Sequence, residues 1–330
     1  PTKGAQKFEK FKGQAGDINA PLEVRESKFE ADLSPESKQY LKWTENAARK
    51  NQSVVHKNTK TGLSIDFCTS CPKRMGGKGR CAYCYVDNAR SGNEIREGSG
   101  GKELKQFWMP GKGLNETNVT DEILRMPPDL VNTLNADGGL RMFSFGDFRP
   151  NIDDGNVRAV LNQAQQKGLM VKAITKEPEL LKRFGDHPNL RVNFSTDGLP
   201  SDISRSVPLD EAYEMTKNMD NVKIRVVATT PDEARMFADD PRVDVVTLYH
   251  GPTGDDLFKI VKYDNPELVK EVGEERLRAE FDSWVDMDGW ADAPPKSKSA
   301  KNYEARHQFY KDVTSKEKNK LCCQGGKCTK

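Results

Sequence analysis

The sequence predicts an α/β fold of six strand–helix units, arranged as an open partial barrel of (β/α)6 type with extensions at both ends. Short apolar, β-branched or aromatic runs recur between residues 61 and 251, and segments with helical character separate them. The last four runs begin 21, 32 and 21 residues apart, the spacing of βα units. Six units are too few to close an eight-fold barrel. A doubly wound sheet is the alternative.

Six strands are predicted from these runs, because β-branched and aromatic residues favour extended backbone. In chain order they are GLSIDF (62–67), LRMFSF (140–145), LMVKAIT (169–175), LRVNFST (190–196), VKIRVVAT (222–229) and VDVVTLYH (243–250).

The segments between the strands carry helix start and stop signals. Gly168 follows Lys167 as a C-cap, and Pro178 occupies a first-turn position. The segments that begin at residues 208 and 231 each place an acidic pair near a helix N-terminus. Alternating strands and helices predict a parallel sheet with right-handed crossovers.

Three regions are expected along the chain. Residues 1–60 form a helical N-terminal extension, and residues 61–260 form the barrel, with a cysteine loop at 68–84 and an exposed insertion at 86–116. Residues 261–330 form a helical, basic C-terminal region that ends in a second cysteine group.

Two helices are expected in the extensions. Ser34 and Pro35 provide the cap and first turn of a helix in the N-terminal region. Residues 266–287 read as one amphipathic helix.

Composition excludes a membrane protein. The 330 residues are 35% hydrophobic and 31% charged, and no run approaches 18 apolar residues. The first thirty residues lack the apolar core of a signal peptide, so a cytoplasmic location is expected. The net charge is +2, but basic residues gather at both ends, which favours contact with nucleic acid or simply keeps a solvated tail soluble.

All seven cysteines lie in two groups. The first is Cys68, Cys71, Cys81 and Cys84, and the second is Cys322, Cys323 and Cys328. An odd number with C-x-x-C spacing favours metal ligands over disulfides. The first group could hold Zn²⁺ tetrahedrally, or three of its thiols could hold a [4Fe–4S] cluster with one iron open. Spacing alone leaves both alternatives open.

The segment Cys81-Ala82-Tyr83-Cys84-Tyr85 resembles the cluster motif of the radical S-adenosylmethionine (SAM) enzymes, with Tyr83 in the aromatic position. The turn from Phe145 to Phe148 stands where that family binds the amino group of SAM, which implies Gly146 and Asp147 as cofactor-binding residues. The resemblance covers about residues 62–250. It implies a TIM-like partial barrel.

A branch of this family found on phages and mobile elements is similar in further motifs. Its recurring Cys-Pro, Cys-Tyr, Gly-Asp-Phe and Thr-Lys elements match residues 71–72, 84–85, 146–148 and 175–176.

One departure from the family concerns the first cluster ligand. Family spacing would place that ligand at residue 77, which here is Gly77. Cys71 is therefore expected to join Cys81 and Cys84 on the cluster, with Cys68 as its substitute. The C-terminal cysteines are expected to form a further metal site, with Cys68 as a candidate fourth ligand.

Polar residues stand at the carboxyl ends of the later strands. The resemblance implies that Ser195 and Asp197 bond the ribose of SAM, that Lys176 pairs with its carboxylate, and that His250 also lies at the cofactor. The alternative is that such residues only cap turns after strands. Arg191 and Arg225 lie within strands, where a charge needs a partner, a polar lumen or exposure.

Two functional hypotheses follow. The first is an enzyme of radical SAM type, which uses a [4Fe–4S] cluster and SAM to form a 5′-deoxyadenosyl radical, and which needs a flavodoxin- or ferredoxin-like reductant. The second is a non-catalytic Zn²⁺ protein that binds nucleic acid through its four-cysteine site and basic ends.

Overall fold

The computed structural model describes residues 32–49, 55–58, 62–65, 82, 122–143, 146–151, 153–249, 253–284 and 321–323. The fold below belongs to the unit that runs from Ser34 to Lys330. Nine longer helices are described in it, with these bounds: α3 (Pro35–Arg49), α7 (Pro128–Ala136), α8 (Asp154–Lys167), α9 (Pro178–Phe184), α10 (Leu209–Thr216), α11 (Pro231–Asp239), α12 (Gly254–Asp264), α13 (Pro266–Val272) and α14 (Glu274–Asp282).

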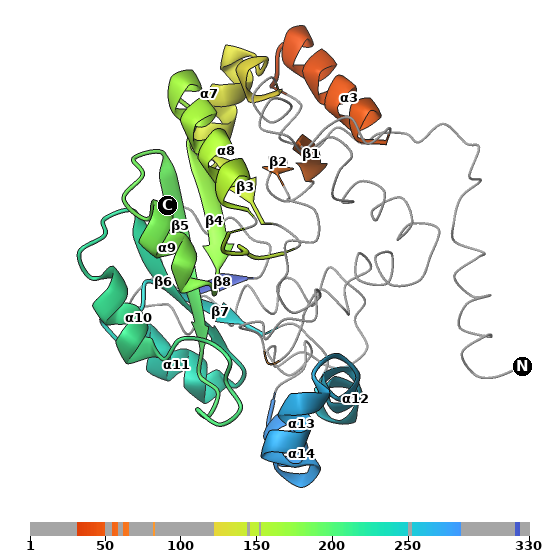
Figure 1. The fold of residues 1–330 in the computed structure, drawn as a ribbon, viewed down its shortest axis with the longest axis vertical. Coiled ribbons are helices and arrows are strands. Elements are labelled where there is room, and N and C mark those ends of the chain that lie inside the picture. Colours follow the sequence, from red (N-terminus) through yellow and green to blue (C-terminus); the bar gives the residue numbers. More distant parts are fainter. Residues whose placement is uncertain are drawn as a thin grey trace, which may run out of the picture. The chain divides into compact units, whose positions relative to one another are not determined.

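One sheet organises the unit. Its eight strands are β1 (Val55–Asn58), β2 (Gly62–Ile65), β3 (Leu140–Met142), β4 (Val171–Thr175), β5 (Leu190–Asp197), β6 (Val222–Ala228), β7 (Val245–Leu248) and β8 (Leu321–Cys323). They lie in chain order from β1 to β8 (Figure 1). β1 pairs antiparallel with β2, and every later neighbouring pair is parallel.

The six predicted parallel strands are confirmed as β2 to β7. Their order never reverses, whereas a doubly wound sheet needs a reversal at its switch point. In the strands that the structure describes, β1 and β8 do not pair, so the sheet is not closed. The architecture is α/β and compatible with a partial barrel.

The crossover helices α8 to α11 cover one face of the sheet. Crossovers between neighbouring parallel strands are right-handed in nearly all proteins, so an unreversed strand order places these helices on the same side. Figure 1 shows them along one side of the strands. The helix start and stop residues expected from the sequence are found at these helices. Gly168 ends α8 with φ 66°, and a proline begins both α9 and α11.

The two faces of the sheet differ in chemistry. Successive side chains of a strand point to opposite faces. One face is apolar, with Val192 and Phe194 of β5 in register with Val222 and Ile224 of β6. The other face carries polar side chains, which are Ser64, Arg141, Lys172, Asn193, Ser195, Arg225 and Thr247.

The predicted helix over residues 266–287 is wrong as a single element. Gly273 has φ 90° and ψ 145°, a conformation that only glycine adopts readily, and it separates α13 from α14. α12 precedes them, and the three helices pack together.

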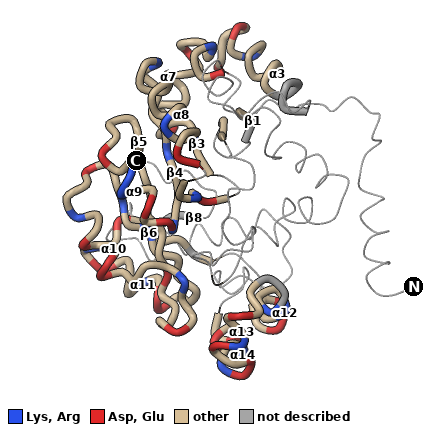
Figure 2. The backbone as a smooth tube through the Cα atoms, viewed as in Figure 1, with Lys and Arg blue, Asp and Glu red and all other residues tan. Residues whose placement is uncertain are grey.

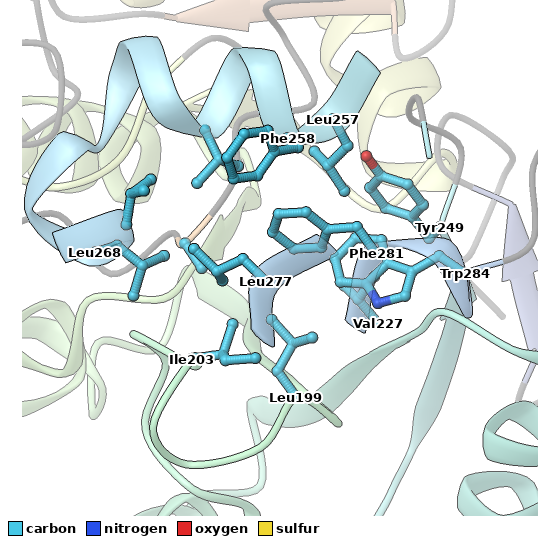
Figure 3. Close-up of a cluster of buried hydrophobic side chains, with 13 residues drawn as sticks. Leu199, Ile203, Val227, Tyr249, Leu257, Phe258, Leu268, Leu277, Phe281 and Trp284 are labelled. Carbon is cyan, nitrogen blue, oxygen red and sulfur yellow. The ribbon is translucent and has the colours of Figure 1, made fainter. Parts of the chain in front are cut away.

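The helices α12, α13 and α14 bury a hydrophobic cluster (Figure 3). Leu257 of α12 and Phe281 of α14 contribute to it, as does Trp284, two residues after α14 ends. The Trp284 ring meets Tyr249 edge-on at 4.7 Å between centroids. Ala82, from the cysteine loop, also belongs to this cluster and is 0% exposed. The cluster therefore brings Ala82 together with the C-terminal helices.

Charges on the described helices are mixed. Figure 2 shows acidic and basic residues interspersed along α10 to α14. Lys262 of α12 pairs with Glu274 of α14, and Arg205 of the β5–α10 loop pairs with Glu271 of α13. No helix in the described ranges is long and apolar enough to cross a membrane.

Candidate functional site

The turn after β3 begins with a strained residue. Phe143 has φ 57°, which is unusual for a bulky side chain, and its amide donates to the Ile65 carbonyl at 3.1 Å. Its ring meets Phe148 edge-on, with 6.3 Å between centroids. Both rings are buried, so they anchor the two ends of the turn that contains Gly146 and Asp147. Strain of this kind gathers at functional sites.

Asp147 joins this turn to the carboxyl end of β4. One oxygen, Oδ1, accepts from the Thr175 hydroxyl and from the Phe148 amide at 2.8 Å. The other, Oδ2, accepts from the Lys176 amide at 2.9 Å. Burial raises the pKa of the Asp147 carboxyl to about 6, although these hydrogen bonds act in the opposite direction. Oδ2 keeps one acceptor position beyond these bonds.

Lys176 continues the connection to β5. Its Nζ lies 2.8 Å from Asp197 Oδ2 and donates at 2.8 Å to the Ser206 hydroxyl. The Asp197 side chain is fully buried and that of Lys176 is 11% exposed. The backbone of Lys176 therefore holds Asp147 while its side chain holds Asp197.

Two serines of the β5–α10 loop complete the environment of Asp197. Ser204 donates to Oδ1 at 2.7 Å, and Ser206 donates to Oδ2 at 2.5 Å. Burial raises the pKa of Asp197, but Lys176 and the two serines outweigh it and hold the pKa below its ordinary value. Asp197 is an anion fixed by its neighbours.

Three residues expected at the site are therefore in one network, although they come from the ends of three successive strands. Lys176 pairs with Asp197, and Asp197 accepts three hydrogen bonds in all, from Lys176, Ser204 and Ser206. The contacts with a cofactor that the resemblance implies for Lys176 and Asp197 stay predictions. Ser204 and Ser206 were missed, because nothing in the sequence shows that the loop folds back on β5.

A second polar group crosses the sheet beside this network. Ser195 of β5 is in register with Arg225 of β6, and the Arg225 Nε donates to the Thr247 hydroxyl of β7 at 2.7 Å. Arg225 is only 7% exposed, whereas Arg191 is exposed at the opposite end of β5. The Ser195 hydroxyl makes no side-chain hydrogen bond in the described part of the chain. Arg225 thus gives the polar face a buried positive charge.

Other strand-end residues have structural partners. The backbone amide and hydroxyl of Thr229 both donate to Glu233 at 2.7 Å, while Thr230 caps α11. Tyr249 is buried in the cluster of α12 to α14. Both residues are explained by local packing and capping.

Several expected site residues lie outside the described residues. These are His250, Cys68, Cys71, Cys81, Cys84 and Cys328, and for Cys322 and Cys323 the description is limited to the backbone of β8. β2 ends at Ile65, three residues before Cys68. Within the described ranges, no group of three His, Cys, Asp or Glu side chains could hold a metal ion.

Comparisons of the chain with protein-family models, with curated proteins and with solved structures found no match.

Proposed function

We propose that this chain is an iron–sulfur enzyme of radical SAM type, built on an open partial TIM-like barrel. The observation that supports it best is the convergence of Asp147, Lys176 and Asp197 at the carboxyl ends of β3, β4 and β5. In parallel α/β folds this edge is where ligands bind. β2 also ends at this edge, at Ile65, and Cys68 follows three residues later in the sequence.

The described residues fit a zwitterionic, hydroxyl-bearing ligand such as SAM. Asp147 has one acceptor position left for an ammonium group, and the positive charge of that group would favour the ionised form of a carboxyl whose pKa burial raises to about 6. Ser195 offers a hydroxyl without a side-chain partner in the described part of the chain, and Arg225 adds positive potential to the same face. Lys176 acts as a positioning residue, because it fixes both carboxylates.

The metal would be held by thiolates of the first cysteine group. Cys81 and Cys84 are the expected pair, and Cys71 is the expected third ligand with Cys68 as its substitute. When bound, the [4Fe–4S] cluster and SAM would supply reductive cleavage to a 5′-deoxyadenosyl radical that removes hydrogen from a substrate. This chemistry needs an electron donor of flavodoxin or ferredoxin type and a reducing, cytoplasmic compartment.

The test begins with anaerobic purification and reconstitution of the full chain. We expect iron and sulfide in cluster stoichiometry, brown colour, an electron paramagnetic resonance signal after reduction, and 5′-deoxyadenosine from SAM. The signal should change shape when SAM is added, since SAM occupies the open iron. Stoichiometric zinc with neither iron nor SAM cleavage would contradict the proposal and leave the zinc-dependent nucleic-acid-binding alternative.

A further inference from the structure

Three cationic residues lie in one row across neighbouring strands on the polar face of the sheet. Arg141 of β3 is in register with Lys172 of β4, and Lys172 is in register with Arg191 of β5. Neighbouring strands are about 4.8 Å apart, so the Cα atoms of Arg141 and Arg191 are about 10 Å from each other. Each of the three is the second residue of its strand. The row therefore lies toward the amino edge of the sheet.

The strands supply no carboxylate to balance this row. Within the described strands β2 to β7, Asp197 is the sole acidic residue, and it is paired with Lys176. It also stands at the other end of β5 from Arg191, which at about 3.3 Å per residue is about 20 Å away. Like charges at the spacing of neighbouring strands repel each other. The row thus carries an excess of positive charge.

Arg141 has no partner for its guanidinium among the described residues. Its Nε is buried and donates to no acceptor there. The more deeply buried arginines differ, because Arg149 pairs with Asp153 and Arg225 donates to Thr247. A buried donor without an acceptor is costly, and native proteins rarely leave one. The unpaired Nε of Arg141 therefore indicates that a ligand supplies the acceptor.

Solvent reaches the row from the amino edge. Arg191 is exposed, and Arg141 and Lys172 are each partly exposed as whole residues. Lys172 Nζ donates to the Asp137 carbonyl just before β3 at 2.6 Å, so its ammonium is held beside the start of that strand. A small anion can thus approach the row without any unfolding of the sheet.

We infer that this row is a binding site for a phosphate group, with Arg141 as its principal donor and Lys172 and Arg191 adding positive charge beside it. Phosphate carries up to two negative charges, and its tetrahedral oxygens accept from several donors at once. It therefore suits three cations better than a planar carboxylate with one charge does, and a guanidinium can bind it through two parallel hydrogen bonds. The site goes beyond the proposed function and needs no metal.

The test is calorimetric titration of the full chain with pyrophosphate at constant ionic strength. We expect the wild type to bind it, and Arg141→Gln to weaken binding about ten-fold or more, because a charge-assisted hydrogen bond is lost. Arg191→Gln should weaken binding less, since Arg191 is exposed. The matched control is Arg235→Gln in α11, which removes the same charge from an exposed pair with Asp232 and should leave the dissociation constant unchanged.

Urea unfolding distinguishes a ligand-binding arginine from a structural one. In phosphate-free buffer, Arg141→Gln should unfold at the same urea concentration as the wild type or at a higher one, because it removes an uncompensated charge. Pyrophosphate should raise the midpoint of the wild type and not that of the variant. A variant that is less stable than the wild type without phosphate, or that does not fold, would show that Arg141 serves the fold and overturn the inference.

A single-stranded oligonucleotide, used as a second probe, identifies the source of the phosphate. Tighter binding of the oligonucleotide than of pyrophosphate, again lost in Arg141→Gln, assigns the site to a nucleic-acid backbone. A response to pyrophosphate alone assigns it to a small phosphorylated molecule. If the wild type binds neither probe, or if Arg141→Gln binds both as the wild type does, the site is wrong. Iron content and SAM cleavage are separate readouts, so either proposal can fail while the other stands.

Discussion

Lys176 Nζ lies 2.8 Å from Asp197 Oδ2, and both side chains are buried at the carboxyl edge of the sheet. Breaking such a pair leaves one charge uncompensated in a poorly solvated environment. Because Lys176 also holds Asp147 through its backbone, this pair connects the ends of three strands.

Replacing Lys176 with Met should destabilise the protein by about 3–5 kcal/mol, since Asp197 would keep its charge without its cation. The measurement is urea unfolding at neutral pH. The matched control is Lys182→Met, which removes an exposed pair with Glu179 and should cost less than about 1 kcal/mol. Equal effects of the two substitutions would show that the buried pair contributes no more than a surface pair.

Asp147 should make stability depend on pH in a specific direction. Its folded pKa of about 6 lies above the unfolded value of about 3.9, so the folded state binds the proton more tightly. The free energy of unfolding contributed by Asp147 therefore falls as pH rises from about 4 to about 6, and is level above that. In the Asp147→Asn variant, which has no carboxyl at this position, this decrease in the free energy of unfolding should be absent.

The pH dependence is measured as the difference in unfolding free energy between Asp147→Asn and wild type. As pH rises from about 4 to about 6, the variant should become more stable relative to the wild type. Asp202→Asn, at an exposed surface pair with Arg276, serves as the control. A difference that stays flat or moves the other way contradicts the raised pKa.

The same Asp147→Asn variant tests SAM binding. Losing one charge-assisted hydrogen bond to an ammonium costs about 1.5–3 kcal/mol, or roughly ten- to a hundred-fold in affinity. The cluster content should be unchanged, because Asp147 is no metal ligand. Calorimetric titration of reconstituted protein with SAM measures the effect, and an unaltered dissociation constant would remove Asp147 from the site.

Single Cys→Ala variants distinguish iron–sulfur from zinc. Under the enzyme proposal, loss of Cys81 or Cys84 should abolish cluster assembly, while one of Cys68 and Cys71 should be dispensable. Under the zinc alternative, all four should matter about equally and the loop should lose metal and stability together. Iron, sulfide and zinc analysis of each reconstituted variant provides the measurement.

Ala82→Leu should separate metal retention from general stability. Ala82 is fully buried in the cluster of α12 to α14, so the larger side chain should cost about 1–3 kcal/mol and displace the adjacent cysteines. The control is Ala164→Leu in α8, another fully buried alanine remote from the cysteine loop in sequence. Both variants should be destabilised, but only Ala82→Leu should lose iron. If the folded Ala82→Leu variant kept a normal iron content, the hydrophobic packing around Ala82 would not be what positions the metal-binding cysteines.

The six central strands were predictable because each is a short run rich in β-branched, aromatic or other apolar residues between turn signals, as in VKIRVVAT around β6. β1 was missed because VHKN is short and polar, and β8 because LCC gives three residues of pattern. The break at Gly273 was missed because amphipathic spacing continues on both sides of it.

At the candidate site, the sequence identified the residues and not their partners. Lys176 and Asp197 could be selected as polar strand ends, and Asp147 through the family resemblance of its turn. Their mutual bonds, and the two serines that bind Asp197, depend on how separate loops close over the sheet edge. No local pattern encodes that closure.

The unreversed strand order also has a consequence for folding kinetics. From β3 to β7, each strand pairs with the one before it, so loop closure stays short and the sheet can grow unit by unit as the chain leaves the ribosome. Ala82 is different, because its cluster contains Tyr249 and residues of α12 to α14. Its burial must wait until those residues have been synthesised, and β8 is added later still. Burial of Ala82 is therefore a late step, which follows the formation of the strands and helices that receive it.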